Sequence, residues 1–274
     1  MLKPLHEDAI KTFSKYLESL NDSNNPHKQK QADLISYWVK DYIRMISLED
    51  KFEPAKNIVY HRGDILQIHF GYRIGSEHGG LHYAVVIDDN PHNSPVITVV
   101  PLVSMKKGES VESLHPDTIY LGNELYDKLK LKRDTLSSAI TKEITDLNTQ
   151  RDKILQQCTV LKKLISEIEP GPDNSLTEQH LILGDMAVKL ADESQALQQR
   201  IDNLHSDEKL LEKMKKSILK MNQGSVAIPN QITTVSKIRI YDPRKSHDIL
   251  CNIKLSNEGL DAINAKLKDL FIHE

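Results

Sequence analysis

Apolar residues recur at helical spacing over two long stretches of the chain, residues 125–168 and residues 186–221. In both stretches they lie mainly three, four or seven positions apart, which is the pattern of a coiled-coil seam. The residues between the stretches include Glu-Pro-Gly-Pro-Asp-Asn at 169–174, which favours a turn. We therefore predict two nearly equal antiparallel helical arms that bring the chain back to where it left. The seam residues are Leu136, Ile140, Leu147, Ile154, Cys158, Leu161, Ile165 and Ile168, then Met186, Leu190, Leu197, Ile201, Leu204, Leu211, Ile218 and Met221.

Shorter runs of β-branched and aromatic residues on both sides of this hairpin predict strands. The compact strand domain is therefore expected to be discontinuous, with the hairpin inserted into it. The predicted strands are residues 65–70, 83–87, 96–100, 225–229 and 232–241.

The first 53 residues and residues 257–271 read as helical. Residues 32–48 carry one apolar stripe that includes Trp38, and residues 257–271 carry another. The N-terminal stripe is either a docking or dimer surface or, as the amphipathic pattern favours, a helical cap on the strand domain. The predicted divisions are 1–53, N-terminal helices; 54–124, first part of the strand domain; 125–222, hairpin; and 223–274, second part with a C-terminal helix.

Composition limits the class of protein. Apolar content of 39% and aromatic content of 5% are low, as expected for a globular part diluted by solvated helix. A formal net charge of −3 gives no overall basic signature, so any nucleic-acid site must be a local patch. Cys158 and Cys251 suggest neither a disulfide framework nor a zinc knuckle. No apolar run approaches about 18 residues, so a soluble cytoplasmic protein without membrane contact is expected.

The segment between the first two strands concentrates the candidate chemistry. Five of the 11 glycines lie between positions 63 and 80, which indicates sharp turns or close backbone approach. His78 and His82 flank Gly79-Gly80 and no cysteine joins them, so no metal site is expected. His61, His69, His92 and His115 are interpreted as incidental.

A series of motifs then suggests a family. The order is RGDI from Arg62, GSE-x-GG from Gly75, a hydrophobic strand, Asn93-Ser94-Pro95, and Pro-Leu-Val-Ser ending at Ser104, with SVAIPNQITTVSKIRI from Ser225 after the hairpin. This order is similar to the MazF/PemK/Kid family of toxin–antitoxin endoribonucleases. The match covers roughly half of the chain, namely the two strand-rich pieces.

The resemblance implies an α+β fold built on a small SH3-like β-barrel, here with N-terminal helices and an inserted antiparallel coiled-coil hairpin. It implies a homodimeric toxin that cleaves single-stranded RNA without metal or other cofactor. A cognate antitoxin would hold it inactive, and operator DNA would be bound only through the toxin–antitoxin complex.

Such cleavage uses the ribose 2′-OH as nucleophile and needs a base, an acid and donors for the charged phosphorane. His82 occupies the position of a family arginine, and Ser104 matches the family's catalytic threonine or serine. Histidine titrates near neutral pH, whereas arginine is a fixed cation. The hypothesis is that His82 transfers the proton and Ser104 hydrogen-bonds the phosphate. Alternatively, His82 is structural and Ser104 only bonds backbone in a turn.

The substrate is expected to meet the glycine loop and the strands after the hairpin. Thr233 stands where the family pattern carries arginine, so Lys237 or Arg239 would supply the missing phosphate contact. Glu77 has a second reading, as a cap of the loop. The predicted substrate-binding residues are Ser76, Glu77, Gly79, Gly80, Gln231, Thr233, Lys237 and Arg239.

A second function remains open. The departure at His82 is compatible with a catalytically inactive SH3-like barrel that serves as a nucleic-acid- or protein-binding regulatory module. The hairpin is most simply a spacer or dimer arm.

Overall fold

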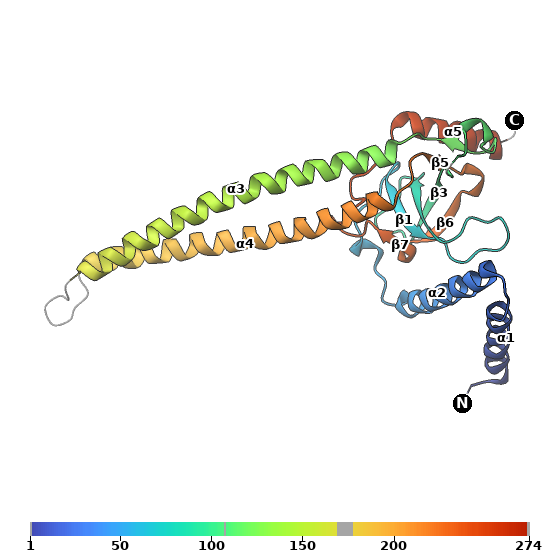
Figure 1. Ribbon diagram of the computed structural model, residues 1–274, viewed down its shortest axis with the longest axis horizontal. Coiled ribbons are helices and arrows are strands. Elements are labelled where there is room, and N and C mark those ends of the chain that lie inside the picture. The colour runs from blue at the N-terminus through green and yellow to red at the C-terminus, as the bar shows by residue number, and fades with distance from the viewer. Residues whose placement is uncertain (1, 107, 169–177, 273–274) are drawn as a thin grey trace. The chain divides into compact units, whose positions relative to one another are not determined.

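The structure is a computed structural model of the 274-residue chain, and it describes all residues except 1, 107, 169–177 and 273–274 (Figure 1). Internal contacts divide the chain into two units. One comprises Met1–Leu125 and Asn222–Glu274, and the other is Tyr126–Met221. The division of the chain into the four parts predicted from the sequence stays a prediction.

An antiparallel sheet of seven strands organises the first unit. Its path runs β4-β5-β3-β2-β1-β7, and β6 pairs with β3 beside β5. Along this path β4 and β7 are the two ends, so the hydrogen bonds of the described residues form an open sheet rather than a closed barrel. The strands are β1 (Ile65–His69), β2 (Leu81–Val86), β3 (Val96–Ser104), β4 (Ile119–Tyr120), β5 (Ser225–Ala227), β6 (Thr233–Ser236) and β7 (Ile240–Asp242).

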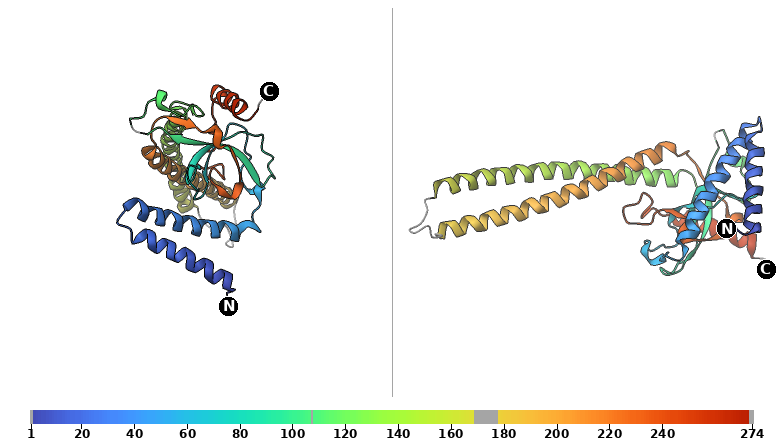
Figure 2. Two further views of the ribbon diagram at one scale, coloured as in Figure 1. Left: turned by 90° about the vertical axis from the view of Figure 1, so that its right-hand side faces the viewer. Right: turned by 90° about the horizontal axis from the view of Figure 1, so that it is seen from below.

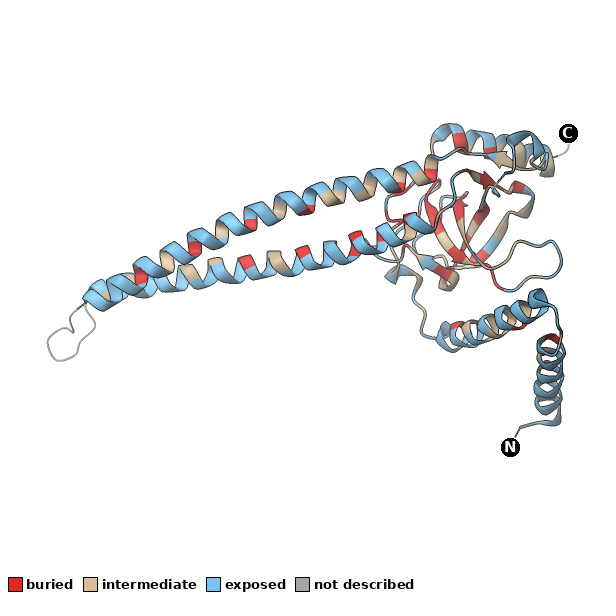
Figure 3. Cartoon of the chain, in the orientation of Figure 1, coloured by how far each residue is buried: buried red, intermediate tan, exposed pale blue. Residues whose placement is uncertain are grey.

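The main core lies on one face of this sheet, where buried residues gather across neighbouring strands (Figure 3). Side chains alternate between the two faces along each strand, and directly paired residues share a face. Ile68 therefore faces the same side as its partner His82. The opposite face is also apolar and buried at Ile65, Val85 and Val100, so these strands read as nearly continuous hydrophobic runs. The core cluster comprises Tyr60, Leu66, Ile68, Phe70, Ala84, Val86, Ile97, Val99, Val235 and Ile240.

The predicted terminal helices are present as α1 (Pro4–Asn21), α2 (Pro26–Glu49) and α5 (Asn257–Phe271). Helices α1 and α2 form an antiparallel pair (Figure 2). The Asn25 side chain caps α2 by accepting a hydrogen bond from the His27 N–H at 2.9 Å, and Ser256 caps α5. Only Ala32 and Met45 of α2 are buried, so most of its apolar stripe is at least partly exposed.

The run predicted as one strand over residues 232–241 is instead two strands separated by a 3₁₀ turn at Lys237–Arg239. Lys237 points into the protein and is 1% exposed. Its Nζ donates to the carbonyl oxygens of Pro91 and His92 at 3.0 and 3.1 Å, and it lies 5.6 Å from the Tyr60 ring centroid. A buried ammonium requires such partners, so the backbone turns to provide them. The short strand β4 was not predicted.

The second unit confirms the predicted helical hairpin. Its arms belong to α3 (Glu124–Glu167) and α4 (Glu178–Lys220), and the predicted turn at 169–174 falls outside the described residues. Arg200 links the arms because it donates to Glu143 at 2.8 Å and to Gln150 at 2.6 Å. The packed seam comprises Ile140, Leu147, Ile154, Leu197, Leu204 and Leu211, flanked by Leu136, Cys158, Leu190 and Ile201.

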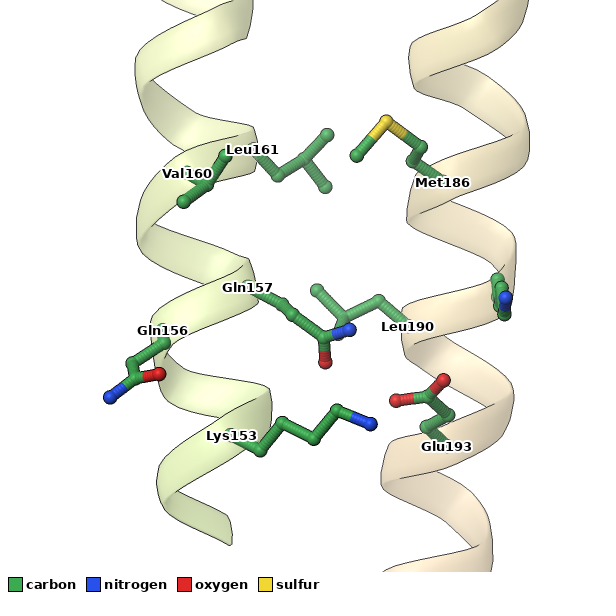
Figure 4. Close-up of a pocket in the computed structure, with 9 residues that line it drawn as sticks. Lys153, Gln156, Gln157, Val160, Leu161, Met186, Leu190 and Glu193 are labelled. Atoms are coloured by element: carbon green, nitrogen blue, oxygen red, sulfur yellow. The ribbon is translucent and has the colours of Figure 1, made fainter. Parts of the chain in front are cut away.

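The seam opens toward the far end of the hairpin. Ile165 and Met186, both predicted seam residues, are 55% and 41% exposed. A cavity of about 400 Å³ lies between the helices there, and Gln157 and Leu190 point into it from opposite sides (Figure 4). Across the described parts of both units, no helix is long and apolar enough to span a membrane.

Candidate functional site

The loop from Phe70 to Gly80 joins β1 to β2 and closes on itself through backbone hydrogen bonds. The Phe70 N–H donates to the Gly80 oxygen, and the Gly80 N–H donates to the Gly71 oxygen, both at 2.8 Å. A Cβ added at Gly79 would lie 2.8 Å from the Gly71 oxygen, closer than real Cβ contacts. Only glycine fits at position 79, so the predicted substrate-binding pair Gly79 and Gly80 first serves to close the loop.

Gln231, which follows the hairpin in the sequence, holds this loop in place. Its Oε1 accepts from the His78 N–H at 2.6 Å, and its Nε2 donates to the Ser76 oxygen at 3.0 Å. The side chains of Ser76 and Glu77 themselves are exposed on the loop. The side-chain amide of Gln231 therefore sets the position of His78.

Two histidines meet where the loop joins β2. The His78 and His82 ring centroids are 4.3 Å apart, and the His78 and Phe70 rings meet edge to face with centroids 5.3 Å apart. Burial, the neighbouring His82 and Arg73 together lower the pKa of His78 to about 4. Burial also lowers the pKa of His82. Nε2 of His78 is buried and has no hydrogen-bond partner among the described residues. The pair is neutral at pH 7 and can accept a proton.

Ser104 lies on the other face of the sheet. Tyr83 pairs with Leu102, so these two side chains share a face, and Ser104 joins them because it follows Leu102 by two residues. His82 precedes Tyr83 and therefore points to the opposite face. Ser104 is exposed at the end of β3, where it pairs with Ser225. The fold brings His82 to His78 but not to Ser104.

The remaining predicted substrate residues are divided between the core and a surface cleft. Thr233 and Arg239 line a cleft of about 470 Å³. Lys237 is buried and bonded to backbone carbonyls, which leaves it without a free surface position for phosphate. Within the described ranges, no group of three or more histidine, cysteine, aspartate or glutamate residues could hold a metal ion.

Comparison with protein families finds a match to the part of the chain that contains β1, β2, β3, β4 and α3. Residues 61–169 match the family described as "PemK-like, MazF-like toxin of type II toxin-antitoxin system". This chain carries a PemK/MazF-like toxin domain. The match starts before β1 and includes β2, β3 and β4, all of the motifs before the hairpin that suggested the family. A search of curated proteins finds no match to the chain.

The matched range ends before the last three strands of the toxin domain's sheet. Strand β5 pairs with β3, β6 pairs with β3, and β7 pairs with β1. These pairings make the segment after the hairpin part of the same sheet, as the motif order predicted. The sheet that the matched strands begin is thus completed by residues that lie more than 100 positions away from β1 along the chain.

Two residues near the site carry chemistry that the sequence analysis did not assign. His78 was considered only as a metal ligand, although its spacing of four residues from His82 across two glycines is a signal for proximity. Arg73 lies in the same loop, and its Nε donates to the Phe70 oxygen at 3.0 Å. Both residues take their places only through the closure of the glycine loop.

Proposed function

We propose that this toxin domain is a metal-independent endoribonuclease that cleaves single-stranded RNA. The observation that carries the proposal is the His78–His82 ring pair, 4.3 Å between centroids, beside the glycine loop of a PemK/MazF-like toxin domain. A neutral imidazole is a competent base for a ribose hydroxyl, and general acid–base groups contribute about 10²–10⁴-fold to rate.

In the proposed reaction His82 removes the proton of the 2′-OH, and the 2′-oxygen attacks the adjacent phosphorus. The bond from phosphorus to the 5′-oxygen breaks, that oxygen takes a proton from water, and His82 returns its proton to the solvent. The products are a 2′,3′-cyclic phosphate and a free 5′-OH. His78 lies near enough to tune His82, because its ring is held by Gln231 through the loop backbone.

Ser104 remains in the proposal as a predicted hydrogen-bond donor to phosphate. Its exposed position at the end of β3 leaves it accessible to a strand of RNA. Because it faces away from His82, any contribution of Ser104 would be to binding outside the immediate surroundings of the histidine pair.

The proposed partners follow from the same family. A cognate antitoxin would bind the toxin domain, the toxin would act as a homodimer in the cytoplasm, and operator DNA would be contacted through the toxin–antitoxin complex. The exposed apolar side chains of α1 and α2, such as Leu5, Leu34 and Ile43, offer surface for such contacts.

The test is incubation of the purified chain with a long RNA, followed by mapping of the new 5′ ends. Cleavage should persist in EDTA and leave 5′-OH ends. Deoxyribose on the 5′ side of a cut should abolish cleavage there, because the nucleophile is then absent. A requirement for added Mg²⁺ would refute the mechanism. Binding of RNA without cleavage would favour the alternative, an inactive binding module, which the histidine at position 82 keeps open.

A further inference from the structure

The cleft of about 470 Å³ that contains Thr233 and Arg239 lies between α2, the start of the glycine loop and β6. Its volume is within the range of small-ligand sites. Its walls combine two arginines, three aromatic residues and hydroxyl groups. The lining residues that the argument uses are Trp38, Tyr72, Arg73, Thr233 and Arg239.

The two arginines of this cleft converge on one acceptor. Arg73 Nε and Arg239 Nη1 both donate to the Phe70 carbonyl oxygen, at 3.0 and 3.1 Å. Burial and the charge of Arg73 lower the pKa of Arg239. Two like charges at a single neutral carbonyl repel each other, so an anion between them would be stabilised.

The cleft contains little negative charge to balance this pair. Among the described residues, Arg239 has no carboxylate within ion-pair distance, and Arg73 has only Glu77 at 3.9 Å. The Glu77 side chain is 59% exposed, and such a pair is worth little in water. The guanidinium groups therefore retain donors for a phosphate, which arginine binds through two parallel hydrogen bonds.

Trp38 of α2 holds Arg239 in place. The Trp38 ring lies 5.3 Å from the Arg239 guanidinium and stacks on His69 at 4.9 Å with an interplanar angle of 20°. A Cβ added at Gly71 would lie 2.9 Å from the Trp38 ring, so glycine is needed for this close approach. Trp38 lies outside the matched residues 61–169, as do Thr233 and Arg239.

We propose that this cleft binds one nucleotide of a single-stranded RNA, with the phosphate between Arg73 and Arg239 and the base against Tyr72. Tyr72 is 37% exposed and presents an aromatic surface at the rim. Bases stack on such rings without strong sequence preference. Thr233 supplies a hydroxyl for the ribose or phosphate, and Trp38 acts as a positioning residue. The inference rests on the proposed function only in naming RNA as the strand.

The experiment uses the full chain and a 2′-O-methylated RNA oligonucleotide, which cannot be cleaved by 2′-OH attack. Trp38 is the only tryptophan among the 274 residues, so intrinsic fluorescence reports on this cleft. RNA binding should change that fluorescence. Arg73→Gln and Arg239→Gln should each weaken RNA binding about tenfold. Each should also reduce the slope of log affinity against log salt concentration by about 0.7. Arg151→Gln, the same charge change on the hairpin, should have neither effect.

A comparison of uridine monophosphate with inorganic phosphate tests the base contact separately from the phosphate contact. The nucleotide should bind more tightly than phosphate, and Tyr72→Ala should remove that advantage. Equal binding of the two would refute the base contact. The Arg73→Gln variant keeps the test decisive if Arg239→Gln fails to fold, because Arg73 lies on the partly exposed loop.

The cleft proposal and the nuclease proposal can fail independently of each other. Unchanged Trp38 fluorescence at saturating RNA, with unchanged affinity in Arg73→Gln, would refute the cleft as a binding site even if the protein cuts RNA. Binding at the cleft by a protein that cuts no RNA would retain the cleft and refute the nuclease.

Discussion

The buried position of His78 predicts a specific loss of stability in acid. Burial, His82 and Arg73 hold the pKa of His78 at about 4 in the folded protein, against 6.5 for the free side chain. At a pH between these two pKa values, His78 is therefore protonated in the unfolded chain and neutral in the folded protein. Stability from neutral His78 is complete above pH 6.5 and is lost progressively as the pH falls toward 4.

The magnitude follows from the two pKa values. Protonation of His78 in the unfolded chain makes the free energy of unfolding about 2 kcal/mol lower at pH 5 than at pH 7.5. The side chain is only partly buried, so solvent screening reduces this to about 1 kcal/mol. For a unit of this size, that corresponds to a fall in Tm of about 2–4 °C.

The assay is thermal and urea unfolding of the wild type and His78→Gln at pH 7.5 and pH 5. His78→Gln should lose about 1 kcal/mol less than the wild type between the two pH values. The contribution from His69, whose pKa is also lowered by burial, remains in both proteins and cancels in the comparison. His61→Gln, which changes an exposed histidine, should behave as the wild type. An equal acid loss in wild type and His78→Gln would refute the reasoning.

The remaining predictions concern activity. His82→Ala should cut RNA at least about 10²-fold more slowly at saturating substrate. The wild-type rate should change with pH between about pH 5 and 8, toward the acid side of this range because burial lowers the His82 pKa. Full activity in folded His82→Ala would make this histidine structural. Ser104→Ala should raise KM and leave kcat nearly unchanged, since Ser104 faces away from His82; an equal fall in kcat and kcat/KM would instead show a transition-state role. Replacing residues 128–220 by a Gly/Ser linker should retain cleavage, because loop-closure cost changes slowly with length. The oligomeric state or antitoxin affinity should change with it; a shortened protein that is folded by circular dichroism but inactive would place the hairpin in the catalytic site.

Local patterns in the sequence determined most elements of this protein, but not β4 or the turn between β6 and β7. The period of apolar residues in the hairpin predicted α3 and α4 because a long helix needs no distant partner to define its seam. The runs at β1, β2 and β3 were likewise predicted, since alternation and branching are properties of a few adjacent residues. The motif order identified the toxin family before any geometry was known.

The contacts between distant residues were decided only by the tertiary structure. Lys237 was expected to reach phosphate, but the carbonyls of Pro91 and His92 draw its ammonium inward and interrupt the strand. The faces of His82 and Ser104 depend on the register between β2 and β3, which no single strand contains.

The same limit applies to the site itself. Gln231 holds the His78 backbone and Arg239 contacts Trp38, across separations of 153 and 201 residues, because the hairpin returns the chain to the sheet it left. Sequence patterns predict which residues form a helix or strand, since those preferences are local. Which side chains share a cleft depends on how the sheet pairs and where α2 packs, and these are properties of the assembled fold.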